Sequence, residues 1–294
     1  MSIKNVTIAG AGTLGSQIAY QSALCGYQVR IWNPHPERAE KRIAALRPFY
    51  KHDLKLTDEQ FDAGLKNIVS ITNDWETSFK DADLVIEAVP ENLDMKKDFY
   101  AQLCSVLPKE AIIASNSSTY VPSQLVKLVD RPEKFLHLHF ANHIWVFNTA
   151  EIVGTPQTEP AIIQEVVAFA KGIKMLPIVL KKEQHGYIMM NALSVPFLNA
   201  ALGLWGKGVA DPITIDKDWM NSTGAPMGPF MSMDVIGLRT VWAIFSSHAD
   251  TPEQKVIADK LKAMIDAGHY GVEAGEGFYT YPHPAYEDPN FLKE

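Results

Sequence analysis

The N-terminal segment places a glycine-rich turn between two stretches of regular structure. Ile3–Ala9 is an apolar run typical of a buried strand, and residues 10–15 read GAGTLG. Leu14–Cys25 has the spacing of apolar residues expected of a helix, and the Gly26 that follows is a common helix end. A GxGxxG sequence alone is weak evidence. Directly after a strand and at the start of a helix, it indicates a dinucleotide-binding turn.

Each glycine of this turn has a separate role in such a site. Gly10 permits the tight turn, Gly12 lets the backbone approach a pyrophosphate, and Gly15 allows the helix to pack closely on the strand. The pyrophosphate lies on the helix N-terminus, where unpaired N–H groups and the helix dipole favour an anion. We therefore expect Thr13 and Leu14, at the start of the helix, to belong to the cofactor-binding residues as well.

The residue that closes the second strand normally selects the cofactor. An acidic residue about 20 positions after the glycines binds the ribose 2′-hydroxyl of NAD, and its charge disfavours the 2′-phosphate of NADP. Here that residue is Asn33, which can bond a hydroxyl but carries no charge, and His35 and Arg38 follow closely. We favour NAD(H) as the cofactor, and the sequence leaves NADP(H) open.

Apolar strands alternate with amphipathic helices through the rest of the first half. Nearly continuous runs of Val, Ile and Leu separated by helices are typical of a parallel sheet that helices cover on both faces. We thus expect an α/β fold with an N-terminal Rossmann-type domain. The predicted strands after the first are Gln28–Trp32, Ile68–Ile71, Asp83–Val89, Ala111–Ala114, Phe135–Phe140 and a further one around residues 150–153.

The pattern changes near residue 184, after which the periodicity is helical. We expect a dinucleotide-binding domain at residues 1–184 and an all-α substrate and dimerisation domain at residues 185–294. Tyr187–Trp205 is long and apolar, but it contains Asn191 and other polar residues. Because unpaired amides are costly in hydrocarbon, we interpret this segment as a buried core helix of the second domain rather than a membrane span.

Composition argues against several classes of partner. The net charge of −7 repels nucleic acids and anionic membranes, so neither is an expected partner. Cys25 and Cys104 are far apart in the sequence and form no CxxC pattern, which argues against a disulfide scaffold or a zinc–cysteine site. We see no signal peptide at the N-terminus. We expect a cytoplasmic protein without a metal.

Two histidines alternate with apolar residues in the predicted strand Phe135–Phe140. His137 and His139 therefore share one face of the strand. Glu151 lies in the next predicted strand, from which a carboxylate can orient and stabilise an imidazole. Spacing alone leaves two interpretations open, an acid–base histidine or histidines that pair within the core. A His-x-His metal site would lack a third ligand at short spacing.

Motifs spread over the whole chain carry a family resemblance. They are GAGTLGSQIA at 10–19, ADLVIEAVPENLDMKKDFY at 82–100, ASNSST at 114–119, LHFAN at 138–142, AEIVGT at 150–155, TGAPMGPF at 223–230 and GEGFY at 275–279. In their order and spacing they resemble the 3-hydroxyacyl-CoA dehydrogenase family. The resemblance implies an oxidoreductase whose helical second domain dimerises, so we expect a homodimer.

The resemblance assigns roles to individual residues. His139 matches the catalytic histidine of the family, and Glu151 matches the glutamate that pairs with it. Ser118 matches the serine that bonds the reacting oxygen near the nicotinamide, and Asn191 matches an asparagine of the second domain. Alternatively, Ser118 caps the helix that follows. Asn191 comes one residue later after Gly186 than in the family, and its alternative is a packing amide.

Three further residues match contacts to the cofactor in the family. They are Glu91, Lys96 and Asn142. The alternatives for two of them are structural: Glu91 is also an acid at a helix start, which the helix dipole favours, and Lys96 is also an exposed lysine on a helix. The resemblance thus predicts a cofactor site that extends beyond the glycine turn.

The chain departs from the family beside the expected substrate pocket. His143 stands where the family usually has a proline, and Trp145 and Phe147 add aromatic bulk. The sequence of this segment is similar to that of the diketoreductase-like branch of the family, whose substrates need not carry CoA. The helical insert at about residues 39–66, which helps bind CoA in the family, is also shorter. Its basic residues either meet CoA phosphates or face solvent; they are Arg42, Arg47, Lys51 and Lys55.

The sequence predicts hydride transfer between a nicotinamide cofactor and a 3-hydroxy/3-keto substrate, of the 3-hydroxyacyl-CoA dehydrogenase type, with a His139–Glu151 acid–base pair. One alternative is a CoA-independent β-keto or β-diketo reductase, or a sugar-acid dehydrogenase, of the same superfamily. Another is a cofactor-binding protein without activity, and the presence of Ser118, His139, Glu151 and Asn191 together argues against it.

Overall fold

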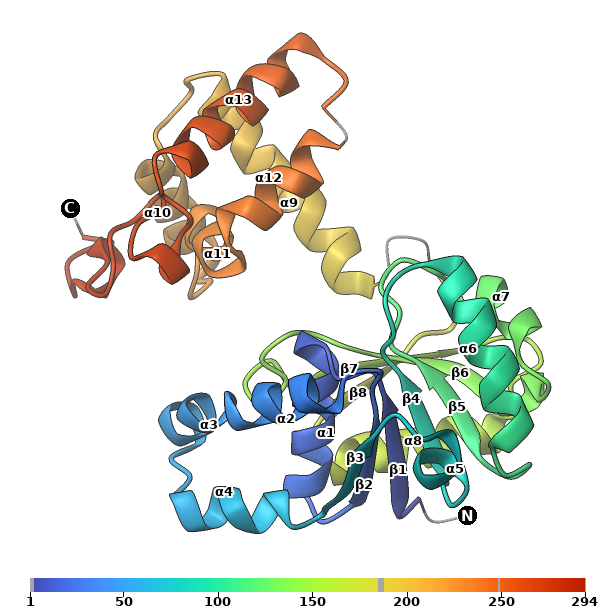
Figure 1. The fold of residues 1–294 in the computed structure, drawn as a ribbon. Coiled ribbons are helices and arrows are strands. Elements are labelled where there is room, and N and C mark those ends of the chain that lie inside the picture. Colours follow the sequence, from blue (N-terminus) through green and yellow to red (C-terminus); the bar gives the residue numbers. More distant parts are fainter. Residues whose placement is uncertain (1–2, 185–187, 248, 294) are drawn as a thin grey trace. The chain divides into compact units, whose positions relative to one another are not determined.

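The computed structural model describes residues 3–184, 188–247 and 249–293, with the side chains of residues 188–191 left out. The chain divides into two compact units, unit 1 (Met1–Ile188) and unit 2 (Met189–Glu294). Unit 1 contains a mostly parallel sheet with helices on its faces, and the named elements of unit 2 are helical (Figure 1). The predicted fold class, a Rossmann-type α/β domain followed by an α-helical one, is confirmed.

The sheet of unit 1 has the strand order β3-β2-β1-β4-β5-β6-β7-β8. The strands from β3 to β6 pair in parallel, β7 runs antiparallel to β6, and β8 pairs in parallel with β7. The strands are β1 Asn5–Ala9, β2 Gln28–Trp32, β3 Ile68–Thr72, β4 Leu84–Glu87, β5 Ile112–Ser115, β6 Phe135–Phe140, β7 Thr149–Gly154 and β8 Leu176–Val179.

Two features of this sheet differ from the sequence prediction. The antiparallel β6–β7 pair makes the sheet mixed rather than fully parallel. The edge strand β8 was not predicted, because it is short, has no fully buried residue and contains Pro177. Proline cannot donate a ladder hydrogen bond and is confined to edge strands and bulges. The weak pattern of β8 is therefore that of an edge.

Side chains of the central strands alternate between two apolar clusters, one on each face. Leu84 and Ile86 of β4 belong to the cluster that includes α1, whereas Val85 belongs to the cluster that includes α6. In β6, Leu138 joins the first cluster and Phe135 the second. This alternation leaves His137 and His139 on the same face as Phe135, as their spacing predicted.

The helices of unit 1 cover both faces of this sheet (Figure 1). The predicted insert between β2 and β3 forms three helices, and Thr57 and Gln60 make a reciprocal capping box at the start of the third. The helices are α1 Thr13–Leu24, α2 Pro36–Ala44, α3 Arg47–Leu54, α4 Asp58–Leu65, α5 Trp75–Phe79, α6 Leu93–Val106, α7 Pro122–Leu125 and α8 Pro160–Gly172.

Two buried aspartates organise unit 2. Asp216 accepts the backbone N–H groups of Phe230 and Met231, and Asp234 accepts two more from the loop after residue 277. A Cβ at Gly228 would lie 2.3 Å from the Asp216 carboxyl carbon. The TGAPMGPF and GEGFY motifs therefore leave room for buried carboxylates. The helices are α9 Ile188–Gly206, α10 Pro212–Thr223, α11 Pro229–Ile236, α12 Leu238–Ser246 and α13 Pro252–Asp266.

The long apolar segment predicted as a buried core helix is α9. Leu198 and Leu202 are buried in the core of unit 2, but Leu193 is 67% exposed. The prediction is therefore right for one stripe of the helix and wrong for another. Within the described residues, no helix has the length and hydropathy that crossing a membrane requires.

Candidate active site

The carboxyl ends of the parallel strands form the edge of the sheet where such folds bind ligands. β1 ends at Ala9, and the glycine turn follows it. β4, β5 and β6 end at Glu87, Ser115 and Phe140 on the same edge, because they run parallel to β1. Ala9, Glu87, Ser115 and His137 are successive partners across the sheet. The predicted site residues of unit 1 therefore gather at one edge.

The glycine turn is packed as the motif requires. Gly10 has a φ of +97°, and a Cβ there would lie 2.5 Å from the carbonyl oxygen of Ala88. A Cβ at Gly15 would lie 2.0 Å from the carbonyl oxygen of Gly10. At Gly12 the nearest atom is a guanidinium nitrogen of Arg42, at 3.6 Å. Packing thus explains Gly10 and Gly15, whereas the space at Gly12 is open to a ligand.

The first turn of α1 is ready to receive an anion. Gly12 precedes the helix without a capping side chain, and no acidic residue lies in the first turn. Thr13 is exposed and Leu14 is partly buried against the core. The open N–H groups and the helix dipole at this end favour a phosphate group.

A pocket of about 570 Å³ lies beside this turn, entirely within unit 1. Its lining includes Gly10, Gly12, Asn33, Arg38 and Arg42. The Asn33 side chain is used by the protein itself: its oxygen accepts the N–H of Ala11 at 3.2 Å, and its nitrogen donates to the carbonyl of His35 at 2.6 Å. The pocket has the position and size for the adenosine end of a dinucleotide.

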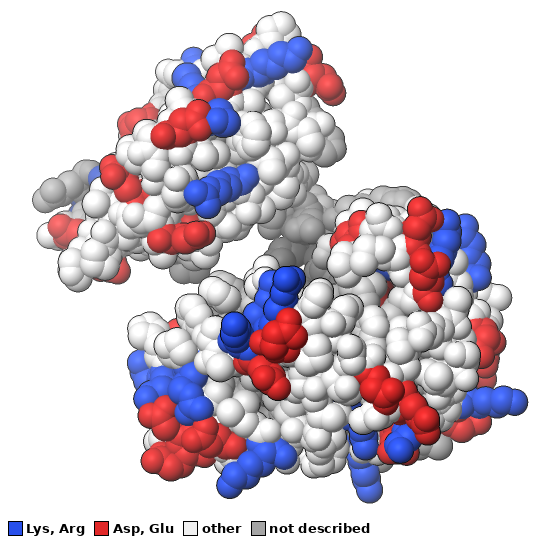
Figure 2. Space-filling model, in the orientation of Figure 1, with Lys and Arg blue, Asp and Glu red and all other residues white. Residues whose placement is uncertain are grey.

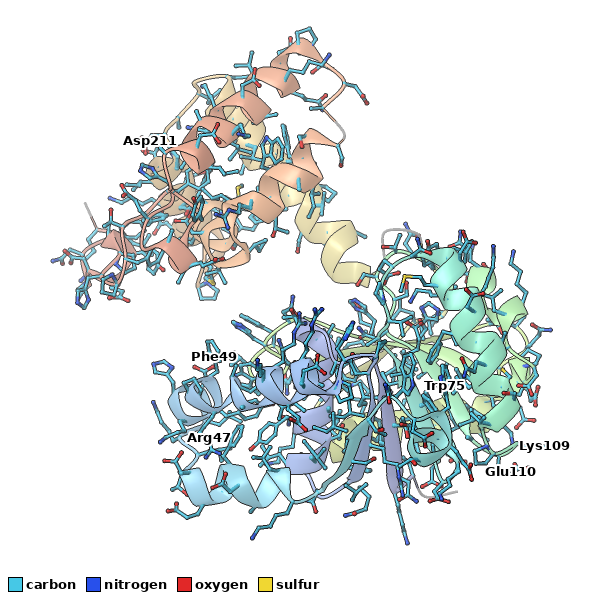
Figure 3. The ribbon with its side chains drawn as sticks, in the orientation of Figure 1. Arg47, Phe49, Trp75, Lys109, Glu110 and Asp211 are labelled. Carbon is cyan, nitrogen blue, oxygen red and sulfur yellow. The ribbon has the colours of Figure 1, made fainter. Side chains whose placement is uncertain are left out.

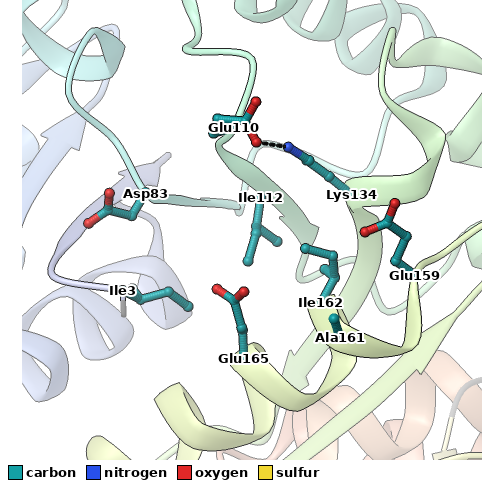
Figure 4. Close-up of a pocket in the computed structure, with 9 residues that line it drawn as sticks. All are labelled: Ile3, Asp83, Glu110, Ile112, Lys134, Glu159, Ala161, Ile162 and Glu165. Carbon is teal, nitrogen blue, oxygen red and sulfur yellow. Dashed lines mark hydrogen bonds and ion pairs between the residues drawn. The ribbon is translucent and has the colours of Figure 1, made fainter. Parts of the chain in front are cut away.

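A second pocket, of about 240 Å³, lies at the amino ends of the strands (Figure 4). Carboxylates dominate its lining, including Asp83, Glu110 and Glu165, and Lys134 is ion-paired with Glu110. Asp83 caps the start of β1 by accepting the N–H groups of Lys4 and Asn5. The negative charge of this second pocket, and its place at the amino edge of the sheet, make the pocket unsuitable for a phosphate-bearing cofactor.

His139, Glu151 and Ser118 lie in line. His139 and Glu151 are direct partners across the antiparallel β6–β7 pair. The Nδ1 atom of His139 is 3.6 Å from a carboxylate oxygen of Glu151, and its Nε2 atom is 2.9 Å from the hydroxyl oxygen of Ser118. The histidine and the glutamate are 7% and 4% exposed, whereas Ser118 is exposed. A carboxylate beside Nδ1 favours a proton there and leaves Nε2 to accept one from a hydroxyl.

Glu91 holds the backbone of Ser118 in this position. Its carboxylate accepts the N–H of Ser118 at 2.9 Å and the hydroxyl of Ser117 at 2.8 Å. Glu91 precedes α6, and its side chain is 36% exposed at the carboxyl edge of the sheet. The structure therefore brings Glu91, predicted as a cofactor contact, into contact with the segment that contains Ser117 and Ser118, called here the serine loop.

Lys96 lies behind this loop rather than at the surface. Its side chain is 0% exposed, and its ammonium donates to Glu87 at 2.5 Å and lies 3.9 Å from Glu91. The buried Glu87 carboxylate also accepts the hydroxyls of Tyr100 and Ser115. The alternative of an exposed helix lysine is therefore wrong. Sequence reasoning missed Glu87, whose signal was a carboxylate at the end of an otherwise apolar strand.

The folded protein disfavours protonation of His137. This histidine is fully buried, and burial, the Lys96 ammonium and His139 together hold its pKa well below the ordinary value of 6.5. A buried imidazole that stays neutral while the unfolded chain takes up a proton makes folding weaker at low pH. We therefore interpret His137 as a structural residue of the core, whereas His139 bonds Ser118.

The pH dependence of stability tests this assignment. Well above pH 6.5 the imidazole of His137 is neutral in both the folded and the unfolded state, so it adds no pH dependence to the stability there. As the pH falls below 6.5, the unfolded state gains a proton that the folded state excludes, at up to about 1.4 kcal/mol per pH unit. Urea unfolding between pH 7.5 and 5.0 should show this loss, and His137→Asn should reduce the slope. An unchanged slope would mean that other groups cause the dependence.

The segment between β6 and β7 carries the departures from the family. His143 has a left-handed φ of 58°, and its backbone N–H donates to the side chain of Gln17. Trp145 is 7% exposed, and its indole N–H donates to Asp53 at 2.7 Å. Phe147 is 50% exposed. Of the three predicted pocket residues, Trp145 is thus mostly covered by the protein, and His143 and Phe147 are exposed.

The Trp145 ring belongs to an aromatic cluster with the helical insert. Its centroid is 4.5 Å from that of Tyr50 and 5.2 Å from that of His143. Phe49 of α3 also approaches both rings and is itself 49% exposed. Sequence reasoning missed Gln17 and Asp53, because nothing local to either residue signals a contact this far along the chain.

Two predicted site residues, Asn142 and Asn191, are not part of the contacts described above. Asn142 is exposed at the end of β6. Asn191 falls within α9, and its side chain lies outside the described residues. Within the described part of the chain, no group of three or more His, Cys, Asp or Glu residues could hold a metal ion.

Comparisons with known proteins show which family the chain is similar to. Two family models match, the 3-hydroxyacyl-CoA dehydrogenase NAD binding domain over residues 5–184 and the 3-hydroxyacyl-CoA dehydrogenase C-terminal domain over residues 186–281. A probable 3-hydroxybutyryl-CoA dehydrogenase of Bacillus subtilis is 30% identical over 286 residues, which cover 96% of this chain and 98% of that one. The 3-hydroxybutyryl-CoA dehydrogenase of Mycobacterium tuberculosis is 31% identical, with 95% and 99% covered.

Solved structures extend the similarity. A diketoreductase described as a catalyst of dicarbonyl compounds is 47% identical, with a TM-score of 0.89 over 96% of this chain and 100% of that one. The (S)-3-hydroxybutyryl-CoA dehydrogenase of Ralstonia eutropha is 29% identical, with a TM-score of 0.77 over 96% and 100%.

Proposed function

Because the chain belongs to the 3-hydroxyacyl-CoA dehydrogenase family, we propose that it transfers a hydride between a nicotinamide cofactor and a 3-hydroxy/3-keto substrate. One observation carries the proposal. The Ser118–His139–Glu151 line lies at the same sheet edge as the glycine turn. An acid–base group and an anion-binding helix start therefore belong to one site, which is what a nicotinamide-dependent reaction of an alcohol requires.

His139 moves the proton in this proposal. In the oxidation direction, its Nε2 would accept the proton of the substrate hydroxyl, and in the reduction direction the imidazolium would return that proton to the oxygen. A bound nicotinamide would supply the hydride chemistry. Glu151 stabilises the imidazolium, and Ser118 donates a hydrogen bond to the substrate oxygen as charge develops on it. Asn191 is proposed as a second donor on the resemblance alone.

The chain's own residues fit a dinucleotide cofactor. Gly12 and the start of α1 would hold the pyrophosphate, and the adjacent pocket would hold the adenosine. Glu91 and Asn142, both at the carboxyl edge, are proposed to contact the nicotinamide half. Lys96 is proposed to act on this half through Glu91 rather than by direct contact, since its side chain is covered.

A CoA-free substrate is the second candidate, and two observations favour it. First, the basic residues of the insert that were expected to meet CoA are partly occupied: Arg47 binds Asp62 at 2.5 Å and Lys51 binds Asp58 at 2.6 Å. Figure 3 labels Arg47 and Phe49 in this insert. Second, the aromatic cluster around Trp145 and Phe49 places apolar surface beside the segment after β6. The similar diketoreductase acts on dicarbonyl compounds by its description.

Nicotinamide absorbance with purified protein at neutral pH tests the function. Acetoacetyl-CoA and a β-diketo ester would each be assayed with NADH and with NADPH. A high kcat/KM for acetoacetyl-CoA alone would place the chain with the acyl-CoA enzymes, because CoA then contributes binding energy. A high value for the CoA-free ketone would favour the second candidate. No rate with either substrate and either cofactor would contradict the proposed function.

We also propose that the protein is a cytoplasmic homodimer. Both cysteines are free, which fits a reducing compartment. Exposed apolar side chains are frequent on unit 2, as expected of a surface that a second copy covers. Light scattering at micromolar concentration should give twice the chain mass, and a monomer would contradict the dimer. These exposed residues include Leu193, Val209, Val235 and Ile236.

A further inference from the structure

The end of β2 lacks the charge that would exclude a 2′-phosphate. In an NAD-selective site, a carboxylate at this position bonds the ribose hydroxyls, and its charge repels phosphate. Asn33 carries no charge, and both ends of its amide are already bonded, to the N–H of Ala11 and the carbonyl of His35. Asn33 therefore holds the turn in shape rather than selecting the ribose. No carboxylate lines this pocket.

Two arginines line the same pocket without a partner. Arg38 and Arg42 are one turn apart on α2, so they share a face of the helix. Both are exposed, and among the described residues neither side chain forms an ion pair or a hydrogen bond. Arg47 of the next helix differs, because Asp58 and Asp62 neutralise it. Figure 2 shows Lys and Arg atoms, with Asp and Glu atoms beside them, over the region where Figure 1 draws α2.

The two arginines occupy different ends of the pocket. A guanidinium nitrogen of Arg42 lies 3.6 Å from the Cβ position of Gly12, where the pyrophosphate approaches. Arg38 lies one turn closer to the end of β2, the position at which an acidic residue would bond the adenosine ribose in an NAD-selective site. Glu37, beside Arg38, is 3.8 Å from His35. Arg42 thus lies beside Gly12, and Arg38 lines the same pocket at a position nearer to Asn33 in the chain.

We propose that this pocket takes a 2′-phosphorylated adenosine, so that the chain binds NADP(H) in preference to NAD(H). Arg38 bonds the 2′-phosphate, and Arg42 bonds the pyrophosphate that both cofactors share. The sequence alone favoured NAD(H), because it revealed neither the use of the Asn33 amide nor the place of Arg42. The inference rests on the proposed function only in requiring that the glycine turn bind a dinucleotide.

Equilibrium binding of adenosine fragments tests this without any turnover. The full-length protein would be titrated with 2′,5′-ADP and with 5′-AMP at low salt. The intrinsic tryptophan fluorescence, to which Trp32 in the pocket contributes, would be followed. We expect 2′,5′-ADP to bind about tenfold tighter or more, because a charge-assisted hydrogen bond to phosphate contributes at least that factor. Arg38→Ala should abolish most of this ratio and leave 5′-AMP binding within about twofold.

Two further variants complete the design. Arg42→Ala should weaken both nucleotides, because both carry the 5′-phosphate. Lys41→Ala removes a charge from the same helix outside the pocket and should change neither. Equal binding of the two nucleotides, or an Arg38→Ala variant with an unchanged ratio, would overturn the inference and leave the proposed function standing. Failure of both nucleotides to bind would overturn the inference and the proposed function together.

Discussion

Replacing His139 with glutamine is expected to lower kcat by about 10²- to 10⁴-fold, the usual contribution of a positioned general acid or base. Glutamine keeps a polar side chain of similar size, but it cannot exchange a proton with the substrate oxygen. The loss should fall on kcat and kcat/KM together, because the proton is transferred only in the transition state. Steady-state rates of nicotinamide oxidation with the better ketone substrate would measure it.

Binding measurements separate this effect from misfolding. The affinity for the nicotinamide cofactor should stay within about twofold, because His139 lies at the serine loop rather than at the glycine turn. His283→Gln is the matched control, since that side chain is 90% exposed and lies in unit 2. Wild-type activity in His139→Gln would reject the acid–base assignment. It would leave the histidine as a core residue that bonds Ser118 and lies beside Glu151.

Replacing Lys96 with methionine is expected to destabilise unit 1 by about 3 kcal/mol. Removal of one partner from a buried ion pair costs about 3–5 kcal/mol, because the other charge remains without compensation. Three other donors remain on Glu87, from Val89, Tyr100 and Ser115, which places the expected cost at the lower end. Hydrogen exchange of the β4 and β5 amides reports the opening free energy of this unit alone.

The neighbouring lysine provides the control. Lys97 pairs with Asp94 at the surface, with both side chains more than half exposed, and Lys97→Met should leave the exchange rates unchanged. The double variant Lys96→Met with Glu87→Gln should cost less than the sum of the single variants, because the two groups interact directly. Unchanged stability in Lys96→Met, together with weaker cofactor binding, would instead support the direct cofactor contact that the family resemblance implies.

His139 and Lys96 also show how much of the site can be predicted from the sequence. His139 stands out locally, because polar residues at every second position of a buried strand are unusual and place two histidines on one face. Lys96 has no such signal: on a helix its spacing is equally compatible with solvent and with burial. Only the approach of α6 to the end of β4 decides that it reaches Glu87. The resemblance indicated its importance but not the contact that it makes.

The sequence by itself determined what depends on neighbours in the chain. GAGTLG between a strand and a helix predicts the turn, since the backbone of Gly10 and the packing of Gly15 exclude side chains. Apolar runs separated by helices predict the parallel sheet, because its strands are buried on both faces. β8 escaped prediction because an edge strand buries little, so its residues need not be apolar.

Only the tertiary structure decided the pairings between distant segments. Trp145 donates a hydrogen bond to Asp53 of the insert, and the side-chain amide of Asn33 bonds the backbone of Ala11 and His35. Arg42 comes to Gly12 because α2 packs on α1. The hydrogen-bonding groups of these side chains could pair with any of several partners. The packing of the helices and strands decides which partner each group meets. Periodicity encodes which face of an element is buried, but not which atoms it meets there.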